Sequence, residues 1–417
     1  MEMLINWGVY PVLSALTQLI FPTSTQETAA AVAGAVLTDE APAGASELTS
    51  TSMSFNEEGH LLVTNAKLIK EILKPQRHCE RYMHTDPSCL LLEALSELDQ
   101  EVQVDDHMVT AWPEANATYR KVFRLLLNKV LKDADLMFPV AQDVVAEISC
   151  CAENNLAQDI ERYLHKAIIG KMMGYTQNDE ILRAPRDPTD PLAVWLTIVS
   201  NSPGGQLMLE NGLTVKRAGY LVTNIVGAGE ETTGSVLRAA IVECAINPDI
   251  QDNLHSEIEE AIEKGATLSE AIRDSKTLQH MLIEALRMAA PASQILRRVH
   301  SPFVLGSQSV DSGTVLQVGI RELSRDEAVV GEKPDTFIPS RKVVVDAPAF
   351  LPSLKWFPFG SGSNICPGSK AFIAMAKPFL GLLLYHNILS VSSDYNPYLT
   401  AQVDYARAIH FVKMQRR

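Results

Sequence analysis

The sequence is short of basic residues, and this shortage excludes one large class of function. The 417-residue chain contains 36 Lys and Arg against 50 Asp and Glu, which gives a formal net charge of −14. No dense run of Lys or Arg occurs, and the pairs Arg297-Arg298 and Arg416-Arg417 are too small to form a basic face. Because a general nucleic-acid binder needs such a face, we expect no nucleic-acid partner.

Paired cysteines are also missing. The six cysteines include no Cys-x-x-Cys pair, and two of them, Cys150 and Cys151, are adjacent. In a chain of this length the pattern is typical of a reducing compartment and of mostly structural thiols. We therefore expect a cytoplasmic protein in which a single functional cysteine can stand among inert ones.

No signal peptide is evident, and the apolar segment near the start is too short for an ordinary membrane span. Residues 5–21 are mostly apolar but carry Asn6 and Gln18, and they fall short of the ~20 residues that a spanning helix needs. The preceding residues have no positive charge, which a signal peptide would need. We expect a packed or amphipathic helix that touches a membrane surface. A peripheral or single-pass anchored protein on the cytosolic face is the alternative.

Composition divides the chain into a lead-in, residues 1–50, and one large domain, residues 51–417. Residues 22–50 are rich in Ala, Thr, Ser and Glu with few large apolar residues, as in a linker. Periodicity and turn residues predict the elements of the large domain. Helices are expected at 65–73, 115–170, 216–246 and 250–291 and after Cys366; strands are expected at 53–64, at 299–319 and from about Leu389. This is a mainly α fold with small β-sheets.

The most specific motif runs from Phe359 to Gly368 and contains one cysteine, Cys366, between glycines. An apolar run follows it, so the cysteine lies at the start of a helix, where the helix dipole and free N–H groups favour a thiolate. A shielded thiolate can be an axial ligand of haem iron, and Gly362 and Gly368 allow close backbone approach. The alternative is a buried structural cysteine beside a glycine-rich turn.

A second motif lies inside the predicted helix 216–246. Ala228 and Gly229 remove bulk, which leaves room for a ligand against the backbone, and Glu231 and Thr232 follow directly. An acid beside a hydroxyl can relay protons to a bound group. The alternative is a packing notch of small residues with one solvated polar edge.

Two weaker motifs accompany these: Arg120 and Arg124 lie four residues apart, and Glu284 and Arg287 lie three apart. The four motifs, in this order between about residues 112 and 370, resemble those of the cytochrome P-450 family. The resemblance implies a P-450-like single domain with haem b (iron protoporphyrin IX) between the central helix and the helix after the cysteine loop. Cys366 would be the proximal iron ligand, and Phe359, Gly362 and Gly368 would shape the loop around the ring. One position departs from the pattern: Asn364 stands where the family usually has Arg or His on a haem propionate, so other residues must carry more of that anchoring.

The resemblance also assigns roles outside the cysteine loop. Ala228 and Gly229 would line the oxygen-binding side, with Glu231 as the acid and Thr232 as the alcohol that deliver protons. Candidate propionate ligands are Arg297 or Arg298, with Arg298 preferred. The pair Arg120 and Arg124, expected one turn apart and facing the same way, are further candidates; the alternative is a solvated basic face, which for Arg120 is equally favoured. A structural ion pair, Glu284 with Arg287, would be tied to Arg341.

The function implied is that of a haem-thiolate monooxygenase, typical of secondary metabolism. It would insert one oxygen atom from O2 into an apolar small molecule by hydroxylation or epoxidation. Electrons would come from a separate ferredoxin or reductase-type partner, because the sequence shows no dinucleotide fingerprint. Two alternatives remain: a haem-thiolate peroxygenase or hydroperoxide isomerase that needs no external electrons, and a non-enzymatic helical binding protein with a structural Cys366.

Overall fold

The computed structural model describes residues 53–56, 59–73, 79–81, 113–150, 155–176, 193–349, 351–362, 365–396 and 403–417. The expected lead-in and Asn364 lie outside these described residues, as does the proline-containing loop around residue 188.

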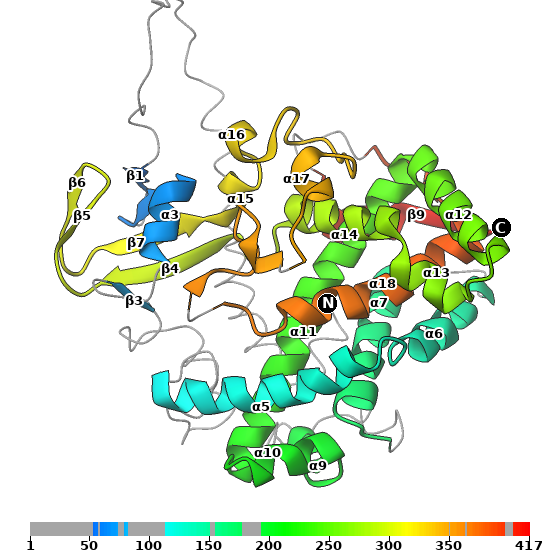
Figure 1. Ribbon diagram of the computed structural model, residues 1–417, viewed down its shortest axis with the longest axis horizontal. Coiled ribbons are helices and arrows are strands. Elements are labelled where there is room, and N and C mark those ends of the chain that lie inside the picture. The colour runs from blue at the N-terminus through cyan, green and yellow to red at the C-terminus, as the bar shows by residue number, and fades with distance from the viewer. Residues whose placement is uncertain are drawn as a thin grey trace, which may run out of the picture.

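A five-stranded sheet with a projecting hairpin forms one side of the molecule, at the left of Figure 1. In sheet order its strands are β1 (Met53–Phe55), β2 (Leu61–Val63), β7 (Val315–Gly319), β4 (Gln294–Val299) and β3 (Cys79–Arg81). The pair β2 and β7 is parallel, whereas the other neighbours are antiparallel. The hairpin consists of β5 (Phe303–Leu305) and β6 (Gln308–Val310). The strands predicted at 53–64 and 299–319 are thus confirmed.

Helices form the larger part of the fold, as the sequence predicts. They are α3 (Ala66–Ile72), α5 (Pro113–Lys132), α6 (Phe138–Cys150), α7 (Leu156–His165), α9 (Ala193–Ser200), α10 (Pro203–Glu210), α11 (Val215–Ile246), α12 (Pro248–Glu263), α13 (Leu268–Asp274), α14 (Lys276–Ala289), α15 (Ile320–Leu323), α16 (Glu327–Val330), α17 (Lys342–Val345), α18 (Ser369–His386) and α19 (Tyr405–Ala408). The single helical region expected at 250–291 is divided, because Thr267 and Ser275 each cap a new helix with their hydroxyl groups.

The long helix α11 crosses the middle of the helical part and contacts α7, α14 and α18 (Figure 1). It begins where the Thr214 hydroxyl accepts a hydrogen bond from the Arg217 amide, and it ends before Pro248, which starts α12. Most of its residues are buried. A polar stretch in this helix therefore needs partners inside the protein or a cavity to face.

The helix after the cysteine loop, α18, is almost entirely buried and packs against α6, α13 and α14. Pro378 lies inside it, where it removes one backbone donor. One turn earlier, the carbonyl of Met375 accepts a 2.5 Å hydrogen bond from the hydroxyl of Tyr163 on α7. The chain then pairs β8 (Asn387–Val391) with β9 (Val412–Arg416) in a separate two-stranded sheet, which confirms the β character predicted near the end.

No helix within the described part of the chain combines the length and the apolar character that crossing a membrane requires.

Candidate functional site

A cavity of about 390 Å³ lies between α11 and the segment that leads into α18. Its wall is mostly apolar, with Phe123 and Leu127 from α5 and Phe372 and Met375 from α18. The sequence-predicted residues that line it are Arg120, Ala228, Gly229, Thr232, Arg297, Phe359, Cys366 and Gly368. The fold thus brings the two main motifs to opposite sides of one cavity.

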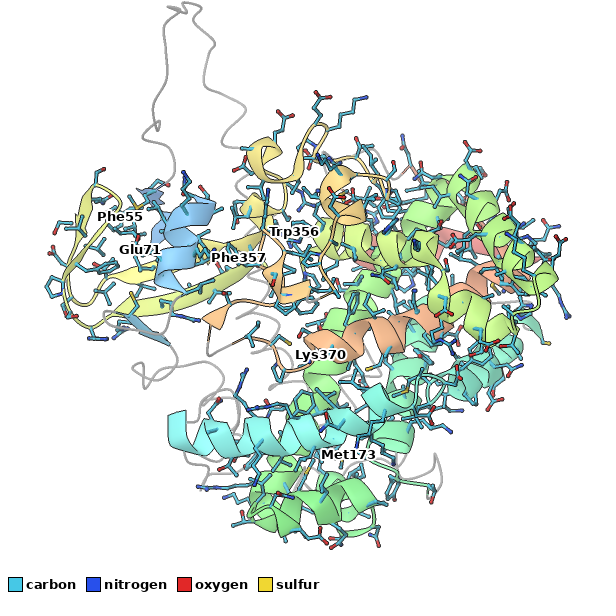
Figure 2. The ribbon with its side chains drawn as sticks, viewed as in Figure 1. Phe55, Glu71, Met173, Trp356, Phe357 and Lys370 are labelled. Atoms are coloured by element: carbon cyan, nitrogen blue, oxygen red, sulfur yellow. The ribbon has the colours of Figure 1, made fainter. Side chains whose placement is uncertain are left out.

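The cysteine loop is held by its own backbone. The amide of Cys366 donates to the Phe359 carbonyl at 2.8 Å, and the Gly360 amide donates to the Phe357 carbonyl at 2.9 Å. Gly362 adopts a φ of 73° and packs so closely that a Cβ there would lie 2.3 Å from the Leu73 carbonyl oxygen. Only glycine fits this position. Figure 2 labels Phe357 and Lys370, which lie on either side of the loop.

The thiol of Cys366 is deep in the fold, yet its side chain is accessible because it opens onto the cavity. Burial raises its pKa. The amides of Gly368 and Ser369, which donate to the sulfur, and the positive charge of Arg120 lower the pKa in part. The predicted stabilisation of the thiolate by the helix start is therefore present but is outweighed by burial. Full ionisation requires a cation at the sulfur, such as a metal ion, because a coordinating thiol is deprotonated outright.

On the opposite wall, the α11 motif presents small groups and two hydroxyls to the cavity. Ala228, Gly229, Thr232 and Thr233 all line it. The Thr232 hydroxyl donates to the Ala228 carbonyl at 2.6 Å, and its oxygen keeps lone pairs with which it can accept a hydrogen bond from the cavity. Thr233 is a lining residue that was not among the predicted site residues, and its position directly after Thr232 was the signal for it.

The two acids of the motif point to different neighbours, and neither lines the cavity. Glu231 lies 3.7 Å from Arg238 in an ion pair, and 36% of its side chain is exposed. Glu230 contacts the Nδ1 atom of His165 at 2.6 Å. Glu231 is therefore partly exposed outside the cavity wall, whereas Thr232 lines the cavity.

On α5 the structure separates Arg120 from Arg124. Arg120 lines the cavity, and its guanidinium donates to the carbonyl of Ile365, next to the cysteine. Arg124 is exposed, does not line the cavity, and bonds back to the Arg120 carbonyl at 3.1 Å. The expectation that both face the site is wrong, because Asn116 and not Arg124 shares the inner face of α5 with Arg120. The sequence signal for Asn116 was its spacing of four residues from Arg120, which places both on one side of the helix.

On β4 the structure favours Arg297 over Arg298. Arg297 lines the cavity, is only 6% exposed, and has an Nε atom without a hydrogen-bond partner among the described residues. Burial lowers the pKa of Arg297 to about 10, and the charge of Cys79 offsets this only in part. Arg298 is absent from the cavity wall. The preference for Arg298 is therefore corrected in favour of Arg297: β4 lines the cavity from Gln294 to Arg297, and Arg298 is the first residue beyond that wall.

Away from the cavity, Glu284, Arg287 and Arg341 form a buried network. Glu284 accepts two hydrogen bonds from Arg287, at 2.7 and 2.9 Å, and one from Arg341 at 3.2 Å. The side chains of Glu284 and Arg287 are fully buried. Both arginines also donate to the Thr336 carbonyl, so the network fastens the segment before Arg341 onto α14.

Metal binding by a cluster of side chains finds no support in the described residues, since no group of three or more His, Cys, Asp or Glu side chains there is placed to hold an ion. A ligand in the cavity would instead meet one sulfur, two guanidinium groups and apolar walls.

Comparison with known proteins finds that the part of the chain carrying this site is similar to one family. A family model described as Cytochrome P450 matches residues 205–397, a range that includes both the α11 motif and the cysteine loop. A (+)-vincadifformine 19-hydroxylase of Catharanthus roseus is 30% identical over 169 residues, which are 40% of this chain and 33% of that protein. Cytochrome P450 72A397 of Kalopanax septemlobus is 22% identical over 365 residues, 82% of this chain and 68% of that protein.

A Bifunctional cytochrome P450/NADPH–P450 reductase of Fusarium oxysporum is 28% identical over 227 residues, which are 52% of this chain and 20% of that protein. The chain spans only about a third of the length of the first curated relatives that it matches.

Proposed function

We propose that the protein is a cytochrome P450 monooxygenase and that the cavity binds haem b with Cys366 as axial ligand. Its similarity to the Cytochrome P450 family model over residues 205–397 and to P450 relatives supports this proposal. The observation that carries this proposal is the placement of the Cys366 thiol across one cavity from Ala228, Gly229 and Thr232. A cysteine-ligated haem, when bound, supplies one-electron and O2 chemistry in which the thiolate favours O–O cleavage.

The residues of the cavity fit this cofactor. Haem is a flat apolar ring with two carboxylates, and the cavity joins apolar walls with the cations of Arg120 and Arg297. The unpartnered Nε of Arg297 supports carboxylate binding in particular, because a buried cation is costly without a charged partner. Asn116, on the same face as Arg120, adds an amide donor at this end.

Proton delivery is the role that we assign to α11. Glu231 is accessible to solvent and is held by Arg238, so it can take up protons from outside the site. Thr232 faces the cavity with its hydroxyl held in place by the Ala228 carbonyl. The acid and the alcohol point to different sides of α11, so the proton route that we propose between them needs a bridging group such as water.

The substrate that we propose is an apolar small molecule, which would be hydroxylated or epoxidised. The mostly apolar cavity wall supports this class, and so do the names of relatives such as the 19-hydroxylase.

Electrons would come from a separate ferredoxin or reductase. The relative that joins a P450 to a reductase supports a reductase as donor. We place the protein in the cytoplasm or at the cytosolic face of a membrane, with residues 5–21 as the contact.

Carbon monoxide difference spectroscopy tests the proposal. The reduced, CO-bound protein is expected to show the Soret band that is specific to thiolate-ligated haem, and Cys366→Ser is expected to remove it. Cys150→Ser is the matched control, because Cys150 is exposed on α6 and outside the cavity. A protein purified without haem, or a band that persists in Cys366→Ser, would refute the assignment.

A second candidate, the peroxygenase or hydroperoxide isomerase, uses the same cysteine and haem. It predicts turnover with hydrogen peroxide or an organic hydroperoxide and none with a reductase and O2. The acid and alcohol on α11 favour the monooxygenase, since an enzyme that is supplied with peroxide has less need of a proton route.

A further inference from the structure

Beyond the described motifs, one wall of the cavity is made by an unusual helix. The helix α7 continues without a break into a π-helix, η5 (Lys166–Met172). The amide of Met173 donates to the Ile168 carbonyl, five residues earlier, at 2.9 Å, which is the π-helical pattern. A π-helix carries an extra residue in its turn, so it redirects the side chains that follow, and such segments often occur at functional sites.

Two side chains of η5 face the cavity, Ile168 and Met172. Ile168 occupies the space that Gly229 leaves on α11, because a Cβ added at Gly229 would lie 2.7 Å from the Ile168 Cδ1 atom. Gly229 is next to Ala228 and one turn from Thr232 and Thr233, which line the same wall. Ile168 thus lies beside the α11 motif in the wall of the cavity.

Both ends of η5 are fastened. At its start, His165 contacts Glu230 of α11 at 2.6 Å through Nδ1. At its end, the carbonyl of Met173, which is labelled in Figure 2, accepts a hydrogen bond from the Gly204 amide of α10 at 2.8 Å. A Cβ at Gly204 would lie 2.9 Å from Met173 atoms, so α10 and η5 are packed closely. The wall that carries Ile168 is therefore fixed at two points.

We propose that η5 sets the size limit of the substrate chamber, with Ile168 as the specificity-determining residue and with Glu230 and His165 as the residues that position the helix. This inference rests on the proposed function, because the chamber is the space left beside the haem. It gives Glu230, the acid of the α11 motif that does not pair with Arg238, a role of its own. Ile168 limits how large a group fits beside Gly229, and Met172 continues the same wall.

The test uses the haem-loaded full chain and two probes that bind haem iron through nitrogen, imidazole and 1-phenylimidazole. The red shift of the Soret band gives a Kd for each probe. Replacing Ile168 by Ala removes three carbons from the wall, and we expect the Kd of 1-phenylimidazole to fall roughly tenfold relative to that of imidazole. Ile168→Phe is expected to change the ratio in the opposite direction.

Ile169→Ala is the matched control. Ile169 is the same residue type in the same π-helix and is equally buried, but it does not line the cavity. It should lower thermal stability as Ile168→Ala does and leave the Kd ratio unchanged. If Ile168→Ala proves too unstable to load, Ile168→Val is expected to shift the ratio in the same direction by a smaller factor.

The outcomes separate the two proposals. If the wild-type protein binds imidazole but Ile168→Ala and Ile169→Ala give the same ratio, or if Ile168→Ala changes both Kd values by the same factor, the role of Ile168 is refuted and the haem assignment stands. If the wild-type protein shows no Soret shift with imidazole, the proposed function fails and the substrate chamber fails with it.

Discussion

Replacing Glu284 by Gln should cost the protein a large share of its stability. The carboxylate accepts hydrogen bonds from Arg287, Arg341 and the Ile338 amide, and its side chain is fully buried. Gln keeps the volume, but it removes the negative charge and turns an NH2 group towards guanidinium donors. Breaking a buried ion pair in this way costs about 3–5 kcal/mol, whereas native proteins as a whole are stable by about 5–15 kcal/mol.

Urea unfolding followed by circular dichroism measures this loss as a fall in the midpoint. The matched control is Glu260→Gln, which removes the carboxylate of a pair with Lys264 at 3.3 Å whose side chains are 67% and 76% exposed. Exposed pairs of this spacing contribute only about 0.3–0.5 kcal/mol. Were Glu284→Gln to unfold at the same urea concentration as Glu260→Gln, burial of the network would not be what stabilises this region.

Three further predictions concern the cavity and the helix behind it. Arg297→Leu should weaken haem retention by roughly ten- to a hundredfold, because a charge-assisted hydrogen bond contributes about 1.5–3 kcal/mol, and Arg298→Leu should change it much less; the rate of haem transfer to an acceptor protein measures both. Thr232→Ala should keep haem but consume O2 without forming product in proportion, and fully coupled turnover in that variant would remove the threonine from proton delivery. Burial lowers the pKa of Lys377 from 10.5 to about 8. The free energy of unfolding should therefore rise between pH 8 and 10.5, because the unfolded chain binds the proton there and the folded chain does not. A stability profile over this range that is no steeper than that of Lys377→Met would contradict this.

Much of the site could be predicted from the sequence because its signals are local. The cysteine loop combines glycines, an aromatic residue and a following apolar run, and the α11 motif interrupts a long apolar helix with small and polar residues. Each of these two motifs can be recognised from about ten consecutive residues. The order of the motifs along the chain then indicated that Cys366 and Thr232 meet.

Choices that depend on three-dimensional register were beyond the sequence. Arg297 and Arg298 are adjacent on β4, and only the folded structure shows that the cavity wall includes Arg297 and not Arg298. Asn116 and Arg124 are each four residues from Arg120, one before it and one after it. Helical periodicity alone therefore could not predict which of the two faces the cavity with Arg120. Glu231 was expected at the site, yet its pairing with Arg238 holds it towards solvent.

The π-helix could not be predicted from the sequence either. The predicted helical region, 115–170, covers most of this π-helix but ends before Met172. Because α- and π-helical turns differ by about one residue, the apolar pattern of Ile168, Ile169 and Met172 suits both. The difference arises from tertiary packing, in which Ile168 fits against Gly229 and the His165 side chain reaches Glu230.

Chain length, as well as residue identity, becomes a variable for redesign at η5. A π-helix is an α-helix with one residue more than its span requires, so deleting a single residue between Lys166 and Met172 would restore the regular hydrogen-bond pattern and rotate the downstream side chains by about a quarter turn. An engineer who wishes to reshape the chamber can therefore use deletion and reinsertion at this segment, a change that substitution libraries do not sample.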